Sequence, residues 1–403
     1  MRKLWNKDFI LLLQGNAVST IGDVMYSIAI GYWVYQATGS NALMGIMSSI
    51  SMFVTMFLSP FCGSIVDKLS RKWVIVGIDV LQGLLMLTVG ILAYRNALNV
   101  PVVLLAALLA AFGSVFYSPA ISTLMIDIIP RDDMVRGQSI HSGAMTLIQL
   151  VGTAFSGVMV AFFGVPLIIV INGLSNIYSA ISELFIRVPK TVRQGEKITV
   201  KGTLKDMKNA GKMIFSDPAL KVFIPCALTI NLLSAGAFTL MLPFCLEKSF
   251  TVDMYGYLVS IWTSASLICV LLLGAVKLSQ KVRFFVMAIG FTAAQIFMIV
   301  GYLSRDFIIL CIFAFLGAFF NTAGNTVFNA SLMLALPEDN RSAILGFIQS
   351  ASVGGSALSA VIYGLLGDAF PLYLVFAAGN VISLAPMLFL CIHPTTKRFI
   401  MTH

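Results

Sequence analysis

Asp23 interrupts a long apolar stretch near its middle. Polar or aromatic residues at helical spacing accompany it: Asn16, Ser19, Thr20, Tyr26 and Ser27. An ionised group at the centre of a bilayer costs on the order of 3 kcal/mol or more, and removal from water favours the neutral form of a carboxylate. The pattern predicts a face that borders water and a carboxylate that binds and releases a proton. A structural hydrogen bond to a neighbouring helix is the alternative.

Two further titratable residues of apolar segments are candidates for proton coupling, Glu183 and His141. Glu183 precedes Arg187 by four residues, a spacing that favours an ion pair. His141 has the side chain best suited to carry a proton near neutral pH, although a structural role is open. Asp79 is expected to join the basic residues between 63 and 72.

Asparagines recur at every fourth position in the segment NTAGNTVFNA, at Asn321, Asn325 and Asn329. On a helix they form one polar stripe, which either lines a substrate path or packs against another helix by amide hydrogen bonds. The other candidates for a substrate path carry polar or aromatic side chains in the first half of the chain: Asn16, Thr20, Tyr26 and Gln149.

The composition places these residues in a membrane. The chain has 403 residues, of which 59% are hydrophobic and 11% charged, and its mean hydropathy is +0.94. Although Lys and Arg outnumber Asp and Glu by 26 to 17, nucleic-acid binding is not expected, because no soluble surface is long enough to carry a basic patch. The six cysteines stand singly in apolar segments, so neither a disulfide framework, a metal site nor a cofactor is indicated.

Apolar stretches long enough to cross a bilayer follow one another along the whole sequence, since about 20 helical residues suffice. We expect an all-α membrane protein with twelve transmembrane helices. Their predicted limits are 8–37, 41–66, 73–95, 100–128, 134–164, 166–187, 219–247, 253–278, 282–303, 307–336, 340–368 and 371–392.

The predicted helices divide into two sets of six: residues 1–187 and 219–403, joined by a polar linker at 188–218. The linker has the pattern of a short amphipathic helix, with a flexible tether as the alternative. GTAFSGVMVAFFG from Gly152 and GSALSAVIYGLLG from Gly355 match each other. Two pseudo-symmetric bundles of this kind are typical of alternating-access transporters.

The distribution of basic residues predicts the orientation. All but three of the 26 Lys and Arg residues fall in segments that are cytoplasmic if the N-terminus is inside, the exceptions being Arg95, Lys248 and Arg305. Because positive loops stay in the cytoplasm, both termini are expected there. The basic start of the chain mimics a signal peptide, but it lacks a clear cleavage site, so a retained first helix is expected.

The loop GSIVDKLSRK, from Gly63 to Lys72, resembles the signature loop of the major facilitator superfamily. Asp67 is expected to face the start of the helix at 340–368, around Ser342, because a helix N-terminus attracts a carboxylate. Arg71 is expected to pair with Asp127 at the end of the helix at 100–128. The residues of this predicted gate are Gly63, Asp67, Lys68, Arg71, Lys72 and Asp127.

Other segments narrow the resemblance within the superfamily: GNAVSTIGD, ATGS, YSPA and LKDMKNAGKMIFSDPALK. They are similar to the branch that holds macrolide-efflux proteins and the enterobactin exporter, which resembles drug/proton antiporters. The antiporter signature is kept at Gly152 and Gly157 but has Thr153 where proline is usual. The resemblance implies a monomeric exporter of amphipathic small molecules in the bacterial inner membrane, driven by protons.

Two other functions stay open at this stage. A proton-coupled or facilitated importer of a nutrient or metabolite would use the same fold. A membrane enzyme is disfavoured, because the three histidines (His141, His393 and His403) have no metal-binding spacing and no nucleophile motif stands at a membrane face. The sequence also lacks the G-x-x-x-x-G-K-[ST] loop that binds nucleotide phosphates.

Overall fold

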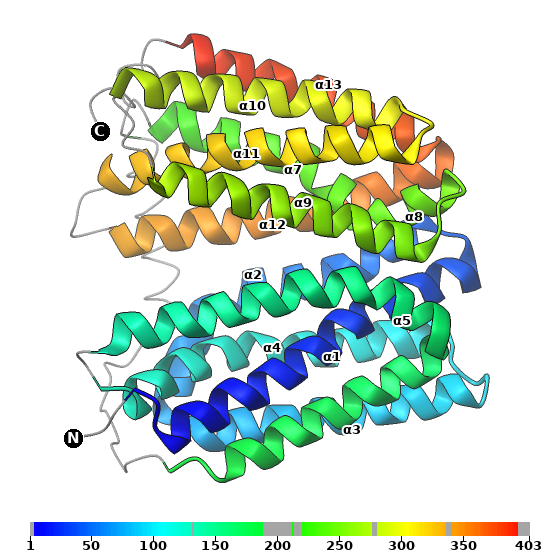
Figure 1. The fold of residues 1–403 in the computed structure, drawn as a ribbon, viewed down its shortest axis with the longest axis vertical. Helices are drawn as coiled ribbons and strands as arrows, with labels where there is room; N and C mark the ends of the chain where they lie inside the picture. The colour runs from blue at the N-terminus through cyan, green and yellow to red at the C-terminus, as the bar shows by residue number, and fades with distance from the viewer. Residues whose placement is uncertain are drawn as a thin grey trace. The chain divides into compact units, whose positions relative to one another are not determined.

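The computed structural model describes residues 4–130, 133–187, 220–275, 280–335 and 341–393, together with the single residues 212 and 216. Every regular element in these ranges is helical. The chain separates into two compact units: Met1–Gly39 with Ile50–Val200, and Ser40–Ser49 with Lys201–His403. Figure 1 labels the helices of both units.

The first unit is built from the helices α1 (Lys7–Thr38), α3 (Arg71–Tyr94), α4 (Val100–Ile128) and α5 (Met134–Leu184), and from most of α2 (Asn41–Lys68). Caps define several of the ends. The Asn6 side chain accepts a hydrogen bond from the Phe9 amide at 2.9 Å and begins α1. Gly39, with φ of 64°, ends α1 in the left-handed conformation that glycine adopts at little cost.

The helix α5 is broken at Gly164, where φ is 74° and ψ is 159°. Pro166 follows, and it lacks the amide that a continuous helix would need there. The break separates the two predicted spans 134–164 and 166–187, and Figure 1 shows that the chain folds back at this point. We call the two parts the first and second arms of α5.

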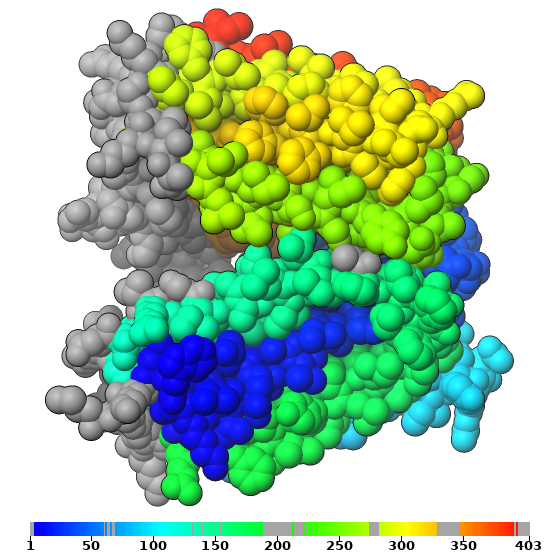
Figure 2. All heavy atoms as spheres, in the orientation of Figure 1, coloured from blue at the N-terminus to red at the C-terminus, as the bar shows by residue number. Residues whose placement is uncertain are grey.

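The helix α1 packs against both arms of α5. Figure 2 shows the blue atoms of α1 between the teal and green atoms of α5. Two glycines allow the approach: a Cβ atom added at Gly22 would lie 2.1 Å from Ser175 Oγ, and one added at Gly15 would lie 3.1 Å from Ser179 Oγ. The contact places the middle of α1 against the polar residues of the second arm.

The second unit contains the start of α2 and the remaining described helices. These are α7 (Leu220–Thr239), α8 (Met241–Glu247), α9 (Val252–Ala275), α10 (Gln280–Leu303), α11 (Phe307–Ala335), α12 (Arg341–Ala369) and α13 (Leu372–Ile392). The predicted span 219–247 is bent by 54° between α7 and α8. Pro243 explains the bend, because it cannot donate the hydrogen bond that would reach the Thr239 carbonyl.

The start of α2 is held against α12 inside the second unit. The Asp368 carboxylate accepts hydrogen bonds from the Asn41 amide at 2.6 Å and from Ser40 Oγ at 2.8 Å. Gly45 faces the Ala360 carbonyl closely enough that a side chain would not fit without movement. A carboxylate at a helix N-terminus compensates the free amides there, so Asp368 serves as a cap for α2.

The chain is a multi-pass membrane protein. Within the described residues, nine helical stretches are long and apolar enough to cross a membrane, and the count is ten if the bent pair α7 and α8 forms one span. The helix α1 and the part of the first arm of α5 before Phe155 lie outside this count. The twelve predicted spans are therefore supported only roughly by length and hydropathy, although helices occupy all twelve positions.

Candidate functional site

A tyrosine hydroxyl of α4 lies between two buried carboxyl groups. Tyr117 Oη is 3.3 Å from Asp79 Oδ2 of α3 and 3.3 Å from Glu183 Oε1 of α5. Asp79 is 1% exposed and Glu183 is 0% exposed. A phenol has one proton, so Tyr117 donates fully to only one carboxylate at a time. The other carboxyl needs a proton of its own or remains an unsatisfied buried charge.

The second arm of α5 presents one polar face to this site. Asn172, Asn176, Ser179 and Glu183 recur at intervals of four, three and four residues, and all are buried. Ser179 lies close to the two carboxyl groups and to Tyr117, but its hydroxyl completes no hydrogen bond within the described part of the chain. Glu183 Oε2 also has no partner among the described residues. The site thus has unfilled hydrogen-bonding capacity.

Asp23 of α1 completes the group. It lies near the side-chain amides of Asn172 and Asn176, and its charge acts on Asp79. The Asp23 side chain is exposed, unlike those of Asp79 and Glu183. We call Asp23, Asp79, Tyr117 and Glu183 the acidic cluster.

The acidic cluster adjoins a cavity of about 430 Å³ in the first unit. Tyr117 belongs to both, since its side chain lines the cavity as well. Three residues predicted to be functional also line it: Asn16, Thr20 and His141. Asn16 Nδ2 donates to His141 Nε2 at 3.0 Å, and Thr20 Oγ1 donates to the Asn16 carbonyl at 2.6 Å. The cavity is therefore polar on one side and reaches the carboxyl groups through a single hydroxyl.

Two predicted pairings in this region are wrong. Asp79 lies eight residues into α3 from Arg71, about 12 Å along the helix axis, and it bonds to Tyr117 rather than to Arg71 or Lys72, the basic residues of the loop whose side chains are described. Glu183 bonds to Tyr117 rather than to Arg187. The helix α5 ends at Leu184, so Arg187 does not share its helical face, and the Arg187 amide bonds to Asp8 at 2.9 Å instead.

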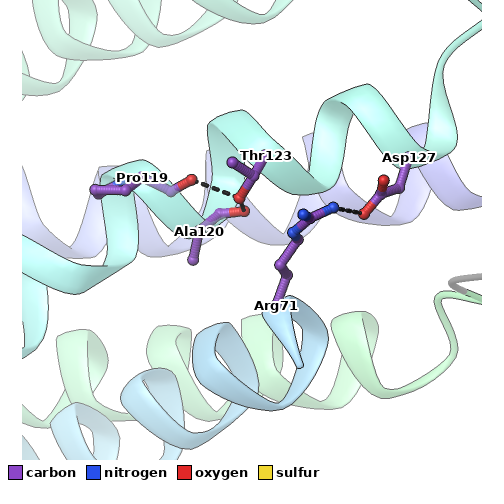
Figure 3. A network of polar contacts seen from close by, with 5 residues as sticks. All are labelled: Arg71, Pro119, Ala120, Thr123 and Asp127. Carbon is purple, nitrogen blue, oxygen red and sulfur yellow. Dashed lines mark hydrogen bonds and ion pairs between the residues drawn. The ribbon is translucent and has the colours of Figure 1, made fainter. Parts of the chain in front are cut away.

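The predicted pair of Arg71 and Asp127 is present in the structure. Figure 3 shows the Arg71 guanidinium pointing at the Asp127 carboxylate, and both side chains are buried, with exposures of 7% and 9%. Lys72 Nζ donates to the Leu184 carbonyl at 2.6 Å and so ties the start of α3 to the end of α5. The surroundings of Gly63 and the side chains of Asp67, Lys68 and the residues around Ser342 lie outside the described part, as does the linker at 188–218 except for residues 212 and 216.

The second unit places the predicted amide stripe beside two adjoining cavities of about 380 and 360 Å³. Asn321 lines both, and Asn325 lines the larger one and donates to Asn321 Oδ1. Asn329 lies in α11, but its side chain is outside the described part. Tyr26 is half-buried close to Asp23, whereas Gln149 is exposed on α5.

Several residues of these sites were not predicted. Asp79 and Tyr117 belong to the acidic cluster and Ser179 lies beside it, while Asn231 and Gln295 line both cavities of the second unit. The polar spacing of the second arm of α5 is visible in the sequence and could have indicated the cluster. Tyr117 carries no such signal, because its partners come from two other helices.

Comparison with known families identifies the fold. The family model of the Major Facilitator Superfamily matches residues 12–248 and 225–401. The chain belongs to this superfamily. It is a transporter rather than an enzyme, and small molecules are the cargo of its family.

Relatives of this superfamily member match about half of its length. Macrolide efflux protein A of Streptococcus pyogenes is 22% identical over 46% of this chain and 46% of its own. Multidrug efflux pump Tap of Mycobacterium bovis (strain BCG / Pasteur 1173P2) is 30% identical over 38% of each chain. This chain thus aligns with less than half of the length of either relative.

A solved structure shares the fold over nearly the whole chain. The nucleoside transporter NupG superposes with a TM-score of 0.74 at 14% identity, covering 94% of this chain and 97% of its own. At this identity the likeness shows the fold alone.

Proposed function

We propose that this transporter exports amphipathic small molecules from a bacterial cell by proton antiport. In this proposal the bundles 1–187 and 219–403 alternate access to the two sides of the inner membrane, the linker 188–218 lies in the cytoplasm with both termini, and the monomer is the working unit. The efflux activities named for the two relatives support export.

The observation that carries the proposal is the acidic cluster beside a cavity. Asp79 and Glu183 are buried against one hydroxyl, so the cluster is stable when it holds a proton and strained when both carboxyl groups are charged. Asp23 is exposed and acts electrostatically on Asp79. A proton that enters at Asp23 would therefore change the charge that Asp79, Tyr117 and Glu183 must accommodate.

A compound bound in the cavity would affect the protonation of the acidic cluster through Tyr117. Tyr117 lines the cavity and bonds to the carboxyl groups, so a compound that donates a hydrogen bond to its oxygen makes the hydroxyl a stronger donor to the cluster. A stronger donor favours the charged form of the carboxyl groups and so the release of a proton. Compound and proton would thereby oppose each other's binding through the same hydroxyl, as antiport requires.

Inverted membrane vesicles test the proposal. Their lumen is acidified by respiration, and the probes are erythromycin, ethidium and chloramphenicol, added outside while a pH-sensitive dye reports the gradient. We expect at least one probe to release lumenal protons and to accumulate inside, with neither effect in Asp23→Asn vesicles. Accumulation that ignores the gradient, or flux only in the opposite direction, would instead support the importer or facilitator. Conversion of a probe into a new compound would support an enzyme.

A further inference from the structure

The two cavities of the second unit share a polar boundary. Four residues line both: Asn231 and Ser234 of α7, Gln295 of α10 and Asn321 of α11. They come from three helices, and Gly290 lets two of these helices approach, since a Cβ atom there would lie 2.8 Å from the Phe320 carbonyl. We call these four residues the amide floor.

The amide floor has hydrogen-bonding groups that the described residues do not satisfy. Gln295 is 3% exposed, and its Oε1 atom has no partner among the residues that the structure describes. Within the same ranges, Ser234 Oγ is also buried without a partner. A buried acceptor left unsatisfied costs about 1–3 kcal/mol, so the floor is built to receive a hydrogen-bond donor.

The walls of the cavities are apolar and aromatic. The larger cavity contains Phe291 and Phe328, whose ring centroids are 6.4 Å apart. The other contains Phe238 and Trp262, at 6.0 Å. One aromatic pair thus stands in each cavity, and the amide floor is common to both.

Charge is missing from this surface. The described lining of the two cavities includes no Asp, Glu, Lys or Arg. A cation that lost its water here would meet aromatic faces and amide oxygens but no counter-charge, and burial of an unpaired charge is costly. An uncharged group that donates a hydrogen bond meets no such penalty.

We propose that the two cavities form a binding site for uncharged, elongated amphipathic compounds that carry hydrogen-bond donors in the middle and an apolar group at each end. The middle binds the amide floor, and the ends lie against the two aromatic pairs. This inference rests on the proposed function, because it names the class of cargo that the exporter recognises. Volumes of about 380 and 360 Å³ suit a small drug-sized molecule.

Equilibrium binding to the full-length protein in detergent tests the site. Radiolabelled chloramphenicol is the probe of the proposed class, since it is uncharged and has hydroxyl and amide donors between an aromatic ring and a chlorinated end. Chloramphenicol diacetate, with both hydroxyls capped, and tetraphenylphosphonium, a cation without donors, are the comparison probes. The variants are Gln295→Leu, Gln295→Asn and the control Gln82→Leu. Gln82 is also an intramembrane glutamine, but it bonds to the Ala110 carbonyl in the first unit.

We expect chloramphenicol to bind more tightly than either comparison probe. Gln295→Leu should weaken its binding about tenfold, the effect of one lost hydrogen bond, while Gln295→Asn retains part of the affinity and Gln82→Leu all of it. Equal or tighter binding of tetraphenylphosphonium, absence of chloramphenicol binding, or unchanged affinity in Gln295→Leu would overturn the site. Detergent solution holds no proton gradient, so a failure of proton antiport in vesicles leaves this result standing, and the reverse also holds.

Discussion

Removal of the Tyr117 hydroxyl tests the acidic cluster most directly. In Tyr117→Phe the ring is kept, so the packing of α4 is retained, but Asp79 Oδ2 and Glu183 Oε1 lose the donor that lies 3.3 Å from each. Since one hydroxyl has one proton, the variant loses one hydrogen bond at a time. A hydrogen bond to a charged group contributes about 1.5–3 kcal/mol.

This energy sets the expected size of the effect. It changes the equilibrium between charged and neutral forms of the cluster by roughly one to two orders of magnitude, because about 1.4 kcal/mol corresponds to a factor of ten. The cluster of Tyr117→Phe should hold its proton more firmly. Gradient-driven accumulation should therefore slow by a similar factor at neutral pH and recover as the pH on the proton-releasing side rises.

The assay is accumulation of a transported probe in inverted vesicles, measured over a range of external pH at constant expression. Tyr178→Phe is the matched control, because Tyr178 lies on the same arm of α5 as Glu183 but is 46% exposed. The control should retain the pH profile of the parent protein. If Tyr117→Phe also retains that profile and the parent rate, the hydroxyl does not couple the cavity to the carboxyl groups, and the reasoning fails.

Three further predictions concern proton coupling, the signature loop and orientation. Asp23→Asn should still bind compound but carry it only downhill, while Asp23→Glu keeps part of the uphill transport. Full uphill transport by Asp23→Asn would exclude Asp23 as the residue that couples protons to transport. Asp127→Asn removes the carboxylate that pairs with the buried Arg71 guanidinium and should lower stability by about 3 kcal/mol, seen as a lower unfolding temperature in detergent; an unchanged temperature would contradict the importance of the pair. A single cysteine in place of Lys201 should be labelled only from the cytoplasm, and one in place of Asn99 only from outside. The opposite result at both positions would reverse the predicted orientation.

Local sequence rules accounted for most of the helix ends. Gly39, Gly164 and Pro371 lie at or next to three of the boundaries between predicted spans, and each stops a helix through its own backbone. The bend between α7 and α8 was not predicted, because the stretch around it is uniformly apolar and Pro243 was not treated as a break. Hydropathy detects length, whereas a bend depends on one missing amide.

Lys248 is an exception to the rule that basic residues stay on the cytoplasmic side, and the exception has a structural cause. It is one of three basic residues predicted on the outer side, and its Nζ donates to the Tyr302 carbonyl at 2.6 Å and to the Ser304 carbonyl near the end of α10. Burial lowers its pKa. A cation at a helix C-terminus satisfies free carbonyl groups, so Lys248 is held there by the fold.

The candidate sites were only partly predictable, for a reason that Asp79 and Glu183 illustrate. Each has a basic residue within eight positions along the sequence, and helical spacing alone favoured those partners. In the structure both side chains turn to Tyr117, which is 38 residues from Asp79 and 66 from Glu183. The choice between a near cation and a distant hydroxyl depends on which helix faces meet, and periodicity within one helix does not contain that information.

The distribution of charge in the described spans favours a division of chemistry between the two units. In the second unit, charged residues of the described helices lie near helix ends, as Asp253 and Asp368 do. The polar groups that line its larger cavity include several side-chain amides. The first unit buries Asp79 in α3 and Glu183 near the end of α5, and it has Asp23 near the middle of α1. Intramembrane carboxyl groups are costly, so their concentration in one unit supports the proposal that this unit binds the proton. An amide keeps one charge state at every pH, so a cavity lined by amides can recognise an uncharged compound equally well before and after the proton has moved.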